Sequence, residues 1–303
     1  MTEDKFTKYD ELCKRVLAHK LILSRILKTC VEEFYDCTLD DIMNKYIEGE
    51  PEIGEAPLRP DQILIHGDSG EDTSLSEQTK RYDIKFRASA PGDGGEIGLI
   101  INIEAERKFD PGYPLIKRGL YYCSRMISSQ YGTEFTRSHY EKLKKVYSIW
   151  LCMDPPEEWQ DSITAYRLPE ENIHGSVRAR RSNYDLIKLI MVCPGENSEP
   201  GSRQRLISLM FSRVIPAVEK DSILLDEFNL SMPKDLKEEV DYMCNLSYGI
   251  AEDATITATF KTRHEAIRNM MSALGLDFNR AADIMRIPAA ERDKYRKLIE
   301  SDV

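Results

Sequence analysis

The fold is decided by the stretch Lys80-Arg-Tyr-Asp-Ile-Lys-Phe-Arg87, the turn Pro91-Gly-Asp-Gly-Gly95, and the segment Glu96-Ile-Gly-Leu-Ile-Ile-Asn-Ile-Glu-Ala-Glu106. In the first segment, apolar residues at positions 82, 84 and 86 alternate with charged ones, a period of two that is typical of a strand with one apolar and one charged face. The Ile-rich third segment predicts the returning strand. Together the segments predict a β-hairpin.

The residues before the hairpin predict helices and a loop. Apolar residues between 5 and 30 recur at a spacing near 3.6, which predicts one helix that ends near Phe34. Thr38, followed by Leu39-Asp40-Asp41, is typical of the N-cap of a second, short helix. The prolines and glycines of residues 49–61 predict a loop, and Gln62–Ile65 a short strand.

The residues after the hairpin predict a helix and then three more strands. The pattern is helical over 113–129, with a short helix over 140–143, and it changes to apolar strand-like runs over 146–152, 162–167 and 186–192. This order of elements predicts an α/β fold with a mixed central sheet flanked by helices.

The C-terminal third predicts a helical region. A linker rich in Pro, Gly, Ser and Glu over 194–202 separates a core domain, residues 1–193, from a second region, residues 194–303. Helices are expected over 205–218 and 234–246 and from His264 onward, where Gly275 and Ile287-Pro288 divide a small three-helix tail. A helix-turn-helix-like role and a simple packing or oligomerisation role both fit this tail.

Composition narrows the class of protein. The 303 residues, 41% hydrophobic, can bury a real core, and no apolar run reaches the roughly 18 residues of a membrane helix. The N-terminal segment lacks the apolar run of a secretory signal, so we expect a soluble, cytoplasmic protein with no membrane partner. Seven cysteines without a Cys-x-x-Cys pair predict buried, reduced thiols, and the five scattered histidines do not predict a zinc site.

The charge of the chain argues against general coating of nucleic acid. The net charge is −10, whereas a protein that binds through a broad positive field is basic. Two basic clusters, Arg178–Arg181 and Lys142–Lys145, leave local contact open, although solvated surface positions are the more ordinary interpretation for them.

The hairpin carries the residues that predict chemistry. Residues two apart in a strand project from the same face, so Glu104 and Glu106 point the same way, with Asn102 beside them. Asp83 lies on the charged face of the partner strand. Three carboxylates that converge there would repel one another unless a cation lay between them, and oxygen ligands favour Mg²⁺ or Mn²⁺. The ordinary alternative is an exposed charged face of a hairpin.

The order of several motifs resembles the PD-(D/E)XK nuclease superfamily, and within it the Rpn-like recombination-promoting nucleases, also called PD-(D/E)XK nuclease family transposases. The resemblance covers most of the chain, and its motifs are Ile22-Leu-Ser-Arg-Ile-Leu-Lys-Thr-Cys-Val-Glu-Glu-Phe34, Arg81-Tyr-Asp-Ile84, Asn102-Ile-Glu-Ala-Glu106, Lys117-Arg-Gly-Leu-Tyr-Tyr122, Tyr140–Trp150, Ala266-Ile-Arg-Asn-Met-Met and Ile287-Pro-Ala-Ala-Glu-Arg292.

This resemblance implies a restriction-endonuclease-like core that hydrolyses DNA with Mg²⁺ in recombination or mobile-element processes. It implies that Asp83 and Glu104 hold the metal, with the Ala105 carbonyl as a further ligand. Arg118 would face the substrate or the carboxylates, or form a structural ion pair. Glu33 would add a carboxylate or lie at the surface. Cutting of both strands would favour a homodimer.

One residue departs from the family pattern. Where the superfamily usually has Lys, and this subgroup often Gln, the chain has Glu106. A lysine orients the attacking water and stabilises the charged phosphate, and a carboxylate has the opposite sign. Glu106 could bind a second metal or accept the proton of the water, and Lys85 or Lys108 could supply the missing cation, with Lys85 the better placed. The alternative is a weakened nuclease-fold protein that acts as a DNA-binding or assembly module.

Overall fold

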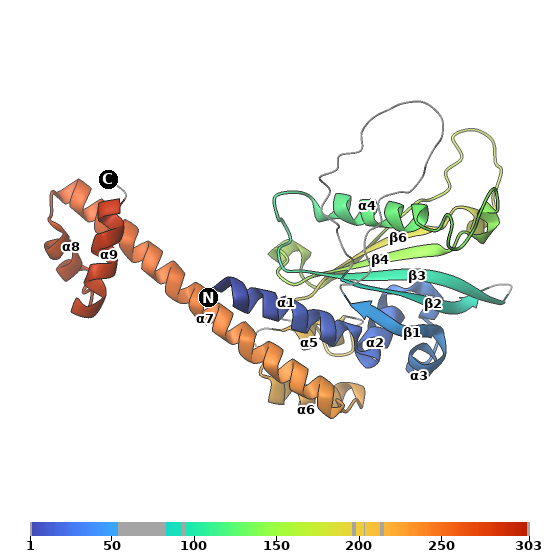
Figure 1. The fold of residues 1–303 in the computed structure, drawn as a ribbon, viewed down its shortest axis with the longest axis horizontal. Helices are drawn as coiled ribbons and strands as arrows, with labels where there is room; N and C mark the ends of the chain where they lie inside the picture. The colour runs from blue at the N-terminus through green and yellow to red at the C-terminus, as the bar shows by residue number, and fades with distance from the viewer. Residues whose placement is uncertain are drawn as a thin grey trace. The chain divides into compact units, whose positions relative to one another are not determined.

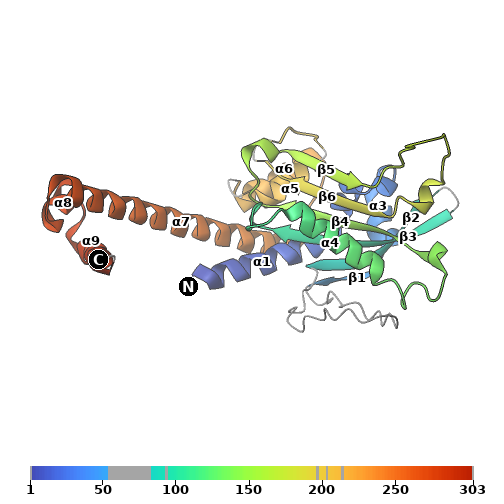
Figure 2. The same ribbon diagram turned by 90° about the horizontal axis from the view of Figure 1, so that it is seen from above.

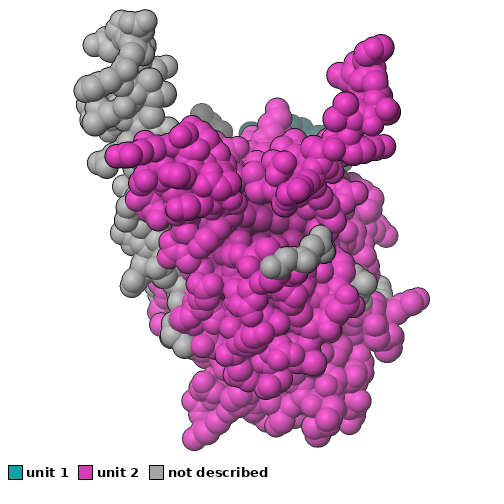
Figure 3. All heavy atoms as spheres, turned by 90° about the vertical axis from the view of Figure 1, so that its right-hand side faces the viewer, with its two compact units in different colours: residues 1–7, 245–303 teal, residues 8–244 magenta. Residues whose placement is uncertain are grey.

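The computed structural model describes residues 2–53, 83–92, 95–195, 198–202, 204–212 and 215–301. The chain divides into two compact units, residues 8–244 and residues 1–7 with 245–303, which are coloured separately in Figure 3. This division differs from the predicted boundary after residue 193. Residues 194–244 join the unit of the sheet, and their helices bury Leu209, Leu224 and Val240 completely.

A mixed sheet of six strands organises residues 8–244, in the order β1-β2-β3-β4-β6-β5. The two pairings β3–β4 and β4–β6 are parallel, and the other three are antiparallel. The strands are β1 (Ile47–Ile53), β2 (Ile84–Gly92), β3 (Gly95–Glu106), β4 (Lys145–Cys152), β5 (Ser162–Arg167) and β6 (Ile187–Cys193). The expected mixed α/β sheet is therefore present.

The predicted hairpin is confirmed as β2 and β3. Ile84 pairs with Ile103 and Phe86 with Ile101, so the apolar positions of both strands share one face. The predicted loop over 49–61 was wrong in its first part, because Ile47–Ile53 pairs with β2 as an edge strand, where Pro51 is tolerated. The predicted strand over 62–65 lies outside the described residues.

Helices cover both faces of the sheet in this unit. Helix α4 (Leu115–Ser128) lies on one face, and α1 (Thr2–Ala18) and α2 (Lys20–Cys30) lie on the other (Figures 1 and 2). The expected single helix over 5–30 was wrong, because it is interrupted at His19. The His19 backbone is extended, and its Nδ1 accepts a hydrogen bond of 3.3 Å from the Leu21 N–H, which caps α2.

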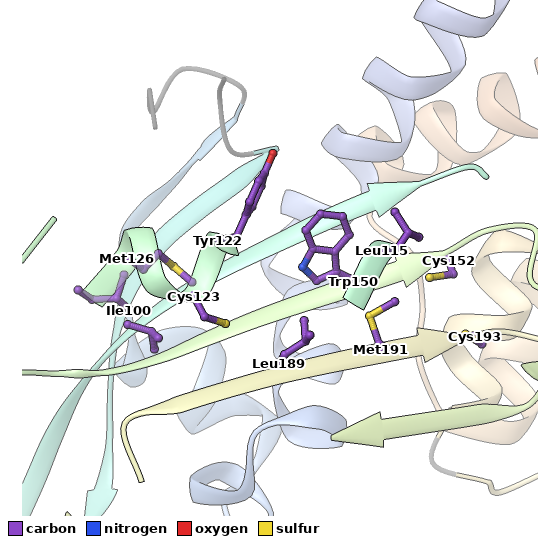
Figure 4. Packing of buried hydrophobic residues seen from close by; sticks show 11 residues of the cluster. Ile100, Leu115, Tyr122, Cys123, Met126, Trp150, Cys152, Leu189, Met191 and Cys193 are labelled. Atoms are coloured by element: carbon purple, nitrogen blue, oxygen red, sulfur yellow. The ribbon is translucent and has the colours of Figure 1, made fainter. Parts of the chain in front are cut away.

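The core under α4 is aromatic and aliphatic. Trp150 of β4 and Tyr122 of α4 are both almost completely buried (Figure 4). Their rings pack edge to face, with the ring centroids 5.2 Å apart. Gly119 allows this close packing, because a Cβ there would lie 2.5 Å from Leu189 Cδ1. Helix α4 therefore lies directly against the sheet.

The short elements agree with their sequence signals. Thr38 Oγ1 accepts a hydrogen bond from the Asp41 N–H at 3.1 Å and caps α3 (Leu39–Asp41), as predicted. The other short helices are η1 (Glu32–Phe34), η2 (Ile42–Tyr46), η3 (Tyr140–Lys142), η4 (Glu157–Trp159) and η5 (Arg181–Asn183). All seven cysteines are free, and all except Cys37 are buried, so the expected burial is confirmed for six of them.

The C-terminal region is helical, as predicted, but its segmentation differs. The helices are α5 (Arg205–Phe211), α6 (Ala217–Phe228), α7 (Lys234–Leu274), α8 (Phe278–Ile284) and α9 (Ala289–Ser301). The predicted helices over 234–246 and from His264 are one continuous helix, because no glycine at positive φ or proline interrupts it before Gly275. None of the described helices has the combined length and apolarity that crossing a bilayer would require.

The end of α7 packs with α8 and α9 around a small core of its own. Tyr295 is buried there and stacks on Phe260, with the ring centroids 4.2 Å apart. Ile267 and Ile287 are also buried. The predicted divisions at Gly275 and before Pro288 are confirmed by the starts of α8 and α9.

Candidate metal site

The side chains of Asp83 and Glu104 each accept a backbone hydrogen bond from the opposite side of the β2–β3 hairpin. The Asp83 N–H donates to Glu104 Oε1 at 3.2 Å, and the Ala105 N–H donates to Asp83 Oδ2 at 3.1 Å. The strand register explains this, because Ile84 faces Ile103 and the next position on each strand brings residue 83 opposite residue 104. The two carboxylates that the sequence placed on one face do lie together.

On β3, the face that carries these carboxylates is largely buried, and not an exposed charged surface. Asn102 is fully buried and Glu104 is 2% exposed, because α4 covers this side of the sheet. The sequence could not show this, since both faces of β3 are covered and only one was expected to be. Burial and the charge of Asp83 raise the pKa of Glu104 well above its ordinary value.

A lysine from α1 completes this part of the site. Lys14 Nζ lies 3.0 Å from Asp83 Oδ1 and 2.6 Å from Asp10 Oδ2. Burial lowers the pKa of Lys14, but the charge of Asp83 and hydrogen bonds to both aspartates outweigh it and raise the pKa. Burial raises the pKa of Asp83 in spite of Lys14. Sequence reasoning missed Lys14, because nothing in its local pattern shows which distant strand α1 covers.

Glu106 is held by a cation of its own. Arg118 Nη1 donates to Glu106 Oε2 at 2.9 Å and also bonds the Tyr113 hydroxyl, while Nη2 bonds the Tyr122 hydroxyl at 3.1 Å. The guanidinium also lies 5.1 Å from the centroid of the Trp150 ring. Burial raises the pKa of Glu106, which Arg118 opposes. Of the roles expected for Arg118, the structure shows an ion pair with a site carboxylate.

The other expected residues fall in different places. Lys85 pairs with Asn102 in the ladder and therefore lies on the Asp83 face, as predicted, whereas Lys108 is exposed beyond the end of β3. Ala105 contributes its N–H to Asp83, and its carbonyl remains a predicted ligand. Glu33 is neither in this site nor at the surface: on the opposite face of the sheet it accepts hydrogen bonds from Lys145 and from Tyr147.

The donor set suits an ion that needs few protein ligands. Within the described ranges, the structure gathers no three His, Cys, Asp or Glu side chains into a group able to hold a metal ion. The carboxylates of Asp83 and Glu104 are near enough for the charge of Asp83 to raise the pKa of Glu104. Mg²⁺ commonly takes one or two carboxylates and fills its shell with waters and substrate phosphates. The Asn102 amide bonds Glu104 Oε1 at 2.8 Å, and its buried Oδ1 has no hydrogen-bond partner among the described residues.

The charges of the site also leave room for a cation. Lys14 and Arg118 are the cations in contact with its carboxylates. With Asp10, which shares Lys14, four carboxylates lie near these two cations, so they outnumber Lys14 and Arg118 by two when all four are ionised. A buried excess of this kind is costly unless a cation or a proton compensates it. The residues present therefore fit a divalent cation between Asp83 and Glu104.

Comparison with known proteins adds no relative to this geometry. No protein-family model matches the chain, and neither a curated protein nor a solved structure matches it.

Proposed function

We propose that the chain is a Mg²⁺- or Mn²⁺-dependent endodeoxyribonuclease with a PD-(D/E)XK-like core. One observation carries the proposal: Asp83 and Glu104 lie opposite each other on the hairpin, each bonded to a backbone N–H of the other side, with Glu104 buried and held by Asn102. The sequence resemblance assigns metal binding to the same two residues. The link to recombination or mobile elements, and a homodimer that cuts both strands, rest on that resemblance alone.

Each residue of the chain has a distinct part in this proposal. Asp83 and Glu104 would hold the ion, which when bound supplies an acidified water and neutralises charge on the phosphate. Lys14 supplies the positive charge that Glu106 cannot, because its ammonium lies beside Asp83. If an ion were held by Asp83, the Lys14 ammonium would give up its contact with that carboxylate and could stabilise negative charge on a phosphate.

Arg118 has a positioning part. Its ion pair and its two tyrosine hydrogen bonds hold the Glu106 carboxylate at the end of β3. Glu106 is thereby compensated in charge and is not required as a metal ligand. On this account Glu106 is a tolerated variant of the usual lysine or glutamine.

A second candidate function is favoured by the two ion pairs of the site, Lys14 with Asp83 and Arg118 with Glu106. If Lys14 and Arg118 stay bound to the carboxylates in the presence of Mg²⁺, the protein is a nuclease-fold protein without cleavage, acting as a DNA-binding or assembly module. Glu106 and the net charge of −10 favour this second function, whereas the carboxylates gathered at the hairpin favour cleavage and make it the first choice.

Plasmid cleavage separates the two functions. The full chain should nick or linearise supercoiled plasmid with Mg²⁺ or Mn²⁺ and not with EDTA. Asp83→Ala and Glu104→Ala should each lower the rate by at least about 100-fold, since loss of groups that merely orient metal ligands costs about 10–100-fold. Asp40→Ala, at an exposed aspartate of α3, is the matched control and should cleave like wild type.

Variants at Glu106 refine the result. Glu106→Gln and Glu106→Lys should keep or increase cleavage, since the carboxylate has no required part. Loss of cleavage in both would mean that the carboxylate is needed, for a second metal or as a proton acceptor. Cleavage that survives Asp83→Ala and Glu104→Ala would remove the site assignment altogether.

A further inference from the structure

The face of the sheet opposite α4 contains a pocket that the proposed nuclease site does not use. Its volume is about 460 Å³, within the range of small-molecule sites. The floor is formed by three neighbouring strands, where Tyr147 of β4, Lys188 of β6 and Arg167 of β5 lie in one row across the sheet. One wall is the end of α2 with Glu32 and Tyr35 after it.

The charges beneath this pocket already compensate one another. Lys145 Nζ bonds Glu32, Glu33 and Asp185 at 2.8–2.9 Å, and Lys188 Nζ bonds Glu32 Oε2 at 2.8 Å. Arg181 adds a third cation through Glu32 and Asp185. Three cations therefore meet three carboxylates, and this network requires no ligand to compensate its charge.

Arg167 is a positively charged residue of the pocket that takes no part in this network. Arg167 lines the pocket from the edge strand β5 and is exposed. Within the described part of the chain it makes no ion pair. Beside it, Ala165 and Ile190 give an apolar floor on the next row of the same strands. The pocket thus combines an apolar surface with a single uncompensated guanidinium.

We propose that this pocket binds a small organic anion, whose carboxylate or phosphate group pairs with Arg167 and whose apolar body lies on Ala165 and Ile190. The planar guanidinium matches the two oxygens of either anionic group. Tyr35, which is 41% exposed, presents a ring surface for an aromatic or aliphatic body. A cation is disfavoured, because Lys188 and Arg167 lie together in the floor.

Calorimetric titration of the full chain in EDTA tests this proposal without involving the nuclease site or DNA. The probes are benzoate and phenyl phosphate, with neutral benzamide as the uncharged comparison. At least one anion should bind with 1:1 stoichiometry, and benzamide at least about 10-fold more weakly. The two anions distinguish a carboxylate from a phosphate as the preferred group.

Two variants place the binding in the pocket. Arg167→Gln should weaken the better anion by about 10–100-fold, the size of a hydrogen bond to a charged group. Ala165→Trp should abolish binding by filling the floor from an exposed edge-strand position. Arg180→Gln, which removes the same charge from an exposed loop, is the matched control and should bind like wild type.

Three results would overturn the proposal. They are the absence of binding by both anions at millimolar concentration, equal binding of benzamide, and binding that both pocket variants leave unchanged. Because all three are measured without metal or DNA, they are independent of whether the chain cleaves DNA.

Discussion

Glu32 and Glu104 lie on opposite faces of one sheet and have opposite electrostatic surroundings. Glu32 accepts hydrogen bonds from Lys145, Lys188 and Arg181. Burial raises its pKa, but these three cations outweigh burial and hold the pKa well below its usual range. Glu104 is bonded to the Asn102 amide and the backbone N–H of Asp83, and its pKa is raised.

This difference in surroundings separates buried charges that stabilise the fold, around Glu32, from buried charges that suit a functional site, around Glu104. On the Glu32 face, each carboxylate has a cation, so the network can join η1 to the strands with no further partner. On the Glu104 face, the carboxylates Asp83, Glu104 and Glu106 outnumber Lys14 and Arg118, the two cations that pair with them at 2.9–3.0 Å. A carboxylate left in excess inside a fold marks a place where an ion or a proton belongs.

Lys145→Met should produce the largest effect, because it removes the central cation of the balanced face. Glu33 and Asp185 would lose their shared partner at 2.8 Å, and breaking a buried ion pair costs about 3–5 kcal/mol. Urea denaturation should show that loss in the free energy of unfolding. Lys144→Met is the control: Lys144 pairs with Glu134 and is more exposed, so its loss should stay within about 1 kcal/mol. Equal effects would contradict the comparison.

Lys14→Gln should lower cleavage by about 10–100-fold at saturating metal, since it removes the ammonium that lies 3.0 Å from Asp83 Oδ1. The same change should tighten Mn²⁺ binding, because the ammonium no longer competes for Asp83. A slower cleavage rate together with tighter Mn²⁺ binding distinguishes a lysine that takes part in cleavage from one that only stabilises the fold. If Lys14 were only structural, Mn²⁺ affinity would change while cleavage at saturating Mn²⁺ would not.

Glu104→Gln should change the pH dependence of stability in metal-free protein. Because the folded-state pKa of Glu104 is raised, the folded chain holds its proton where the unfolded chain has lost it. This stability is present below the ordinary glutamate pKa, about 4.3, and is lost as pH rises through the folded pKa.

Denaturation at pH 5 and pH 8 measures that loss. Wild type should lose free energy of unfolding on going to pH 8, and Glu104→Gln should lose less, by on the order of 1 kcal/mol. Asp83 and Glu106 shift in the same direction, so some slope should remain. Saturating Mg²⁺ should flatten the wild-type profile. An unchanged slope in Glu104→Gln would contradict the assignment.

The parts that the sequence predicted are those set by local periodicity. Alternation over 82–86 and the Gly-rich turn predicted the hairpin, and the period of two brought Asp83 and Glu104 to one face. Thr38 predicted its own helix start, and Gly275 the end of α7.

The parts that it missed depend on packing between distant segments. Whether α4 covers the Glu104 face, and whether α1 brings Lys14 to Asp83, cannot be read from local spacing. Glu33 looked like a candidate for the metal site, but its partner Lys145 belongs to an apolar strand whose pattern gave no sign of a buried cation. The break at His19 was missed for a different reason, because helical spacing continues through it.

Anomalous diffraction from crystals soaked in Mn²⁺ tests the central claim most directly. The account predicts a peak between Asp83 and Glu104, about 2.1 Å from a carboxylate oxygen of each, with Lys14 displaced from Asp83. Loss of that peak in Asp83→Ala would complete the assignment. A peak only elsewhere, or none at saturating Mn²⁺ with Lys14 still bound to Asp83, would contradict it.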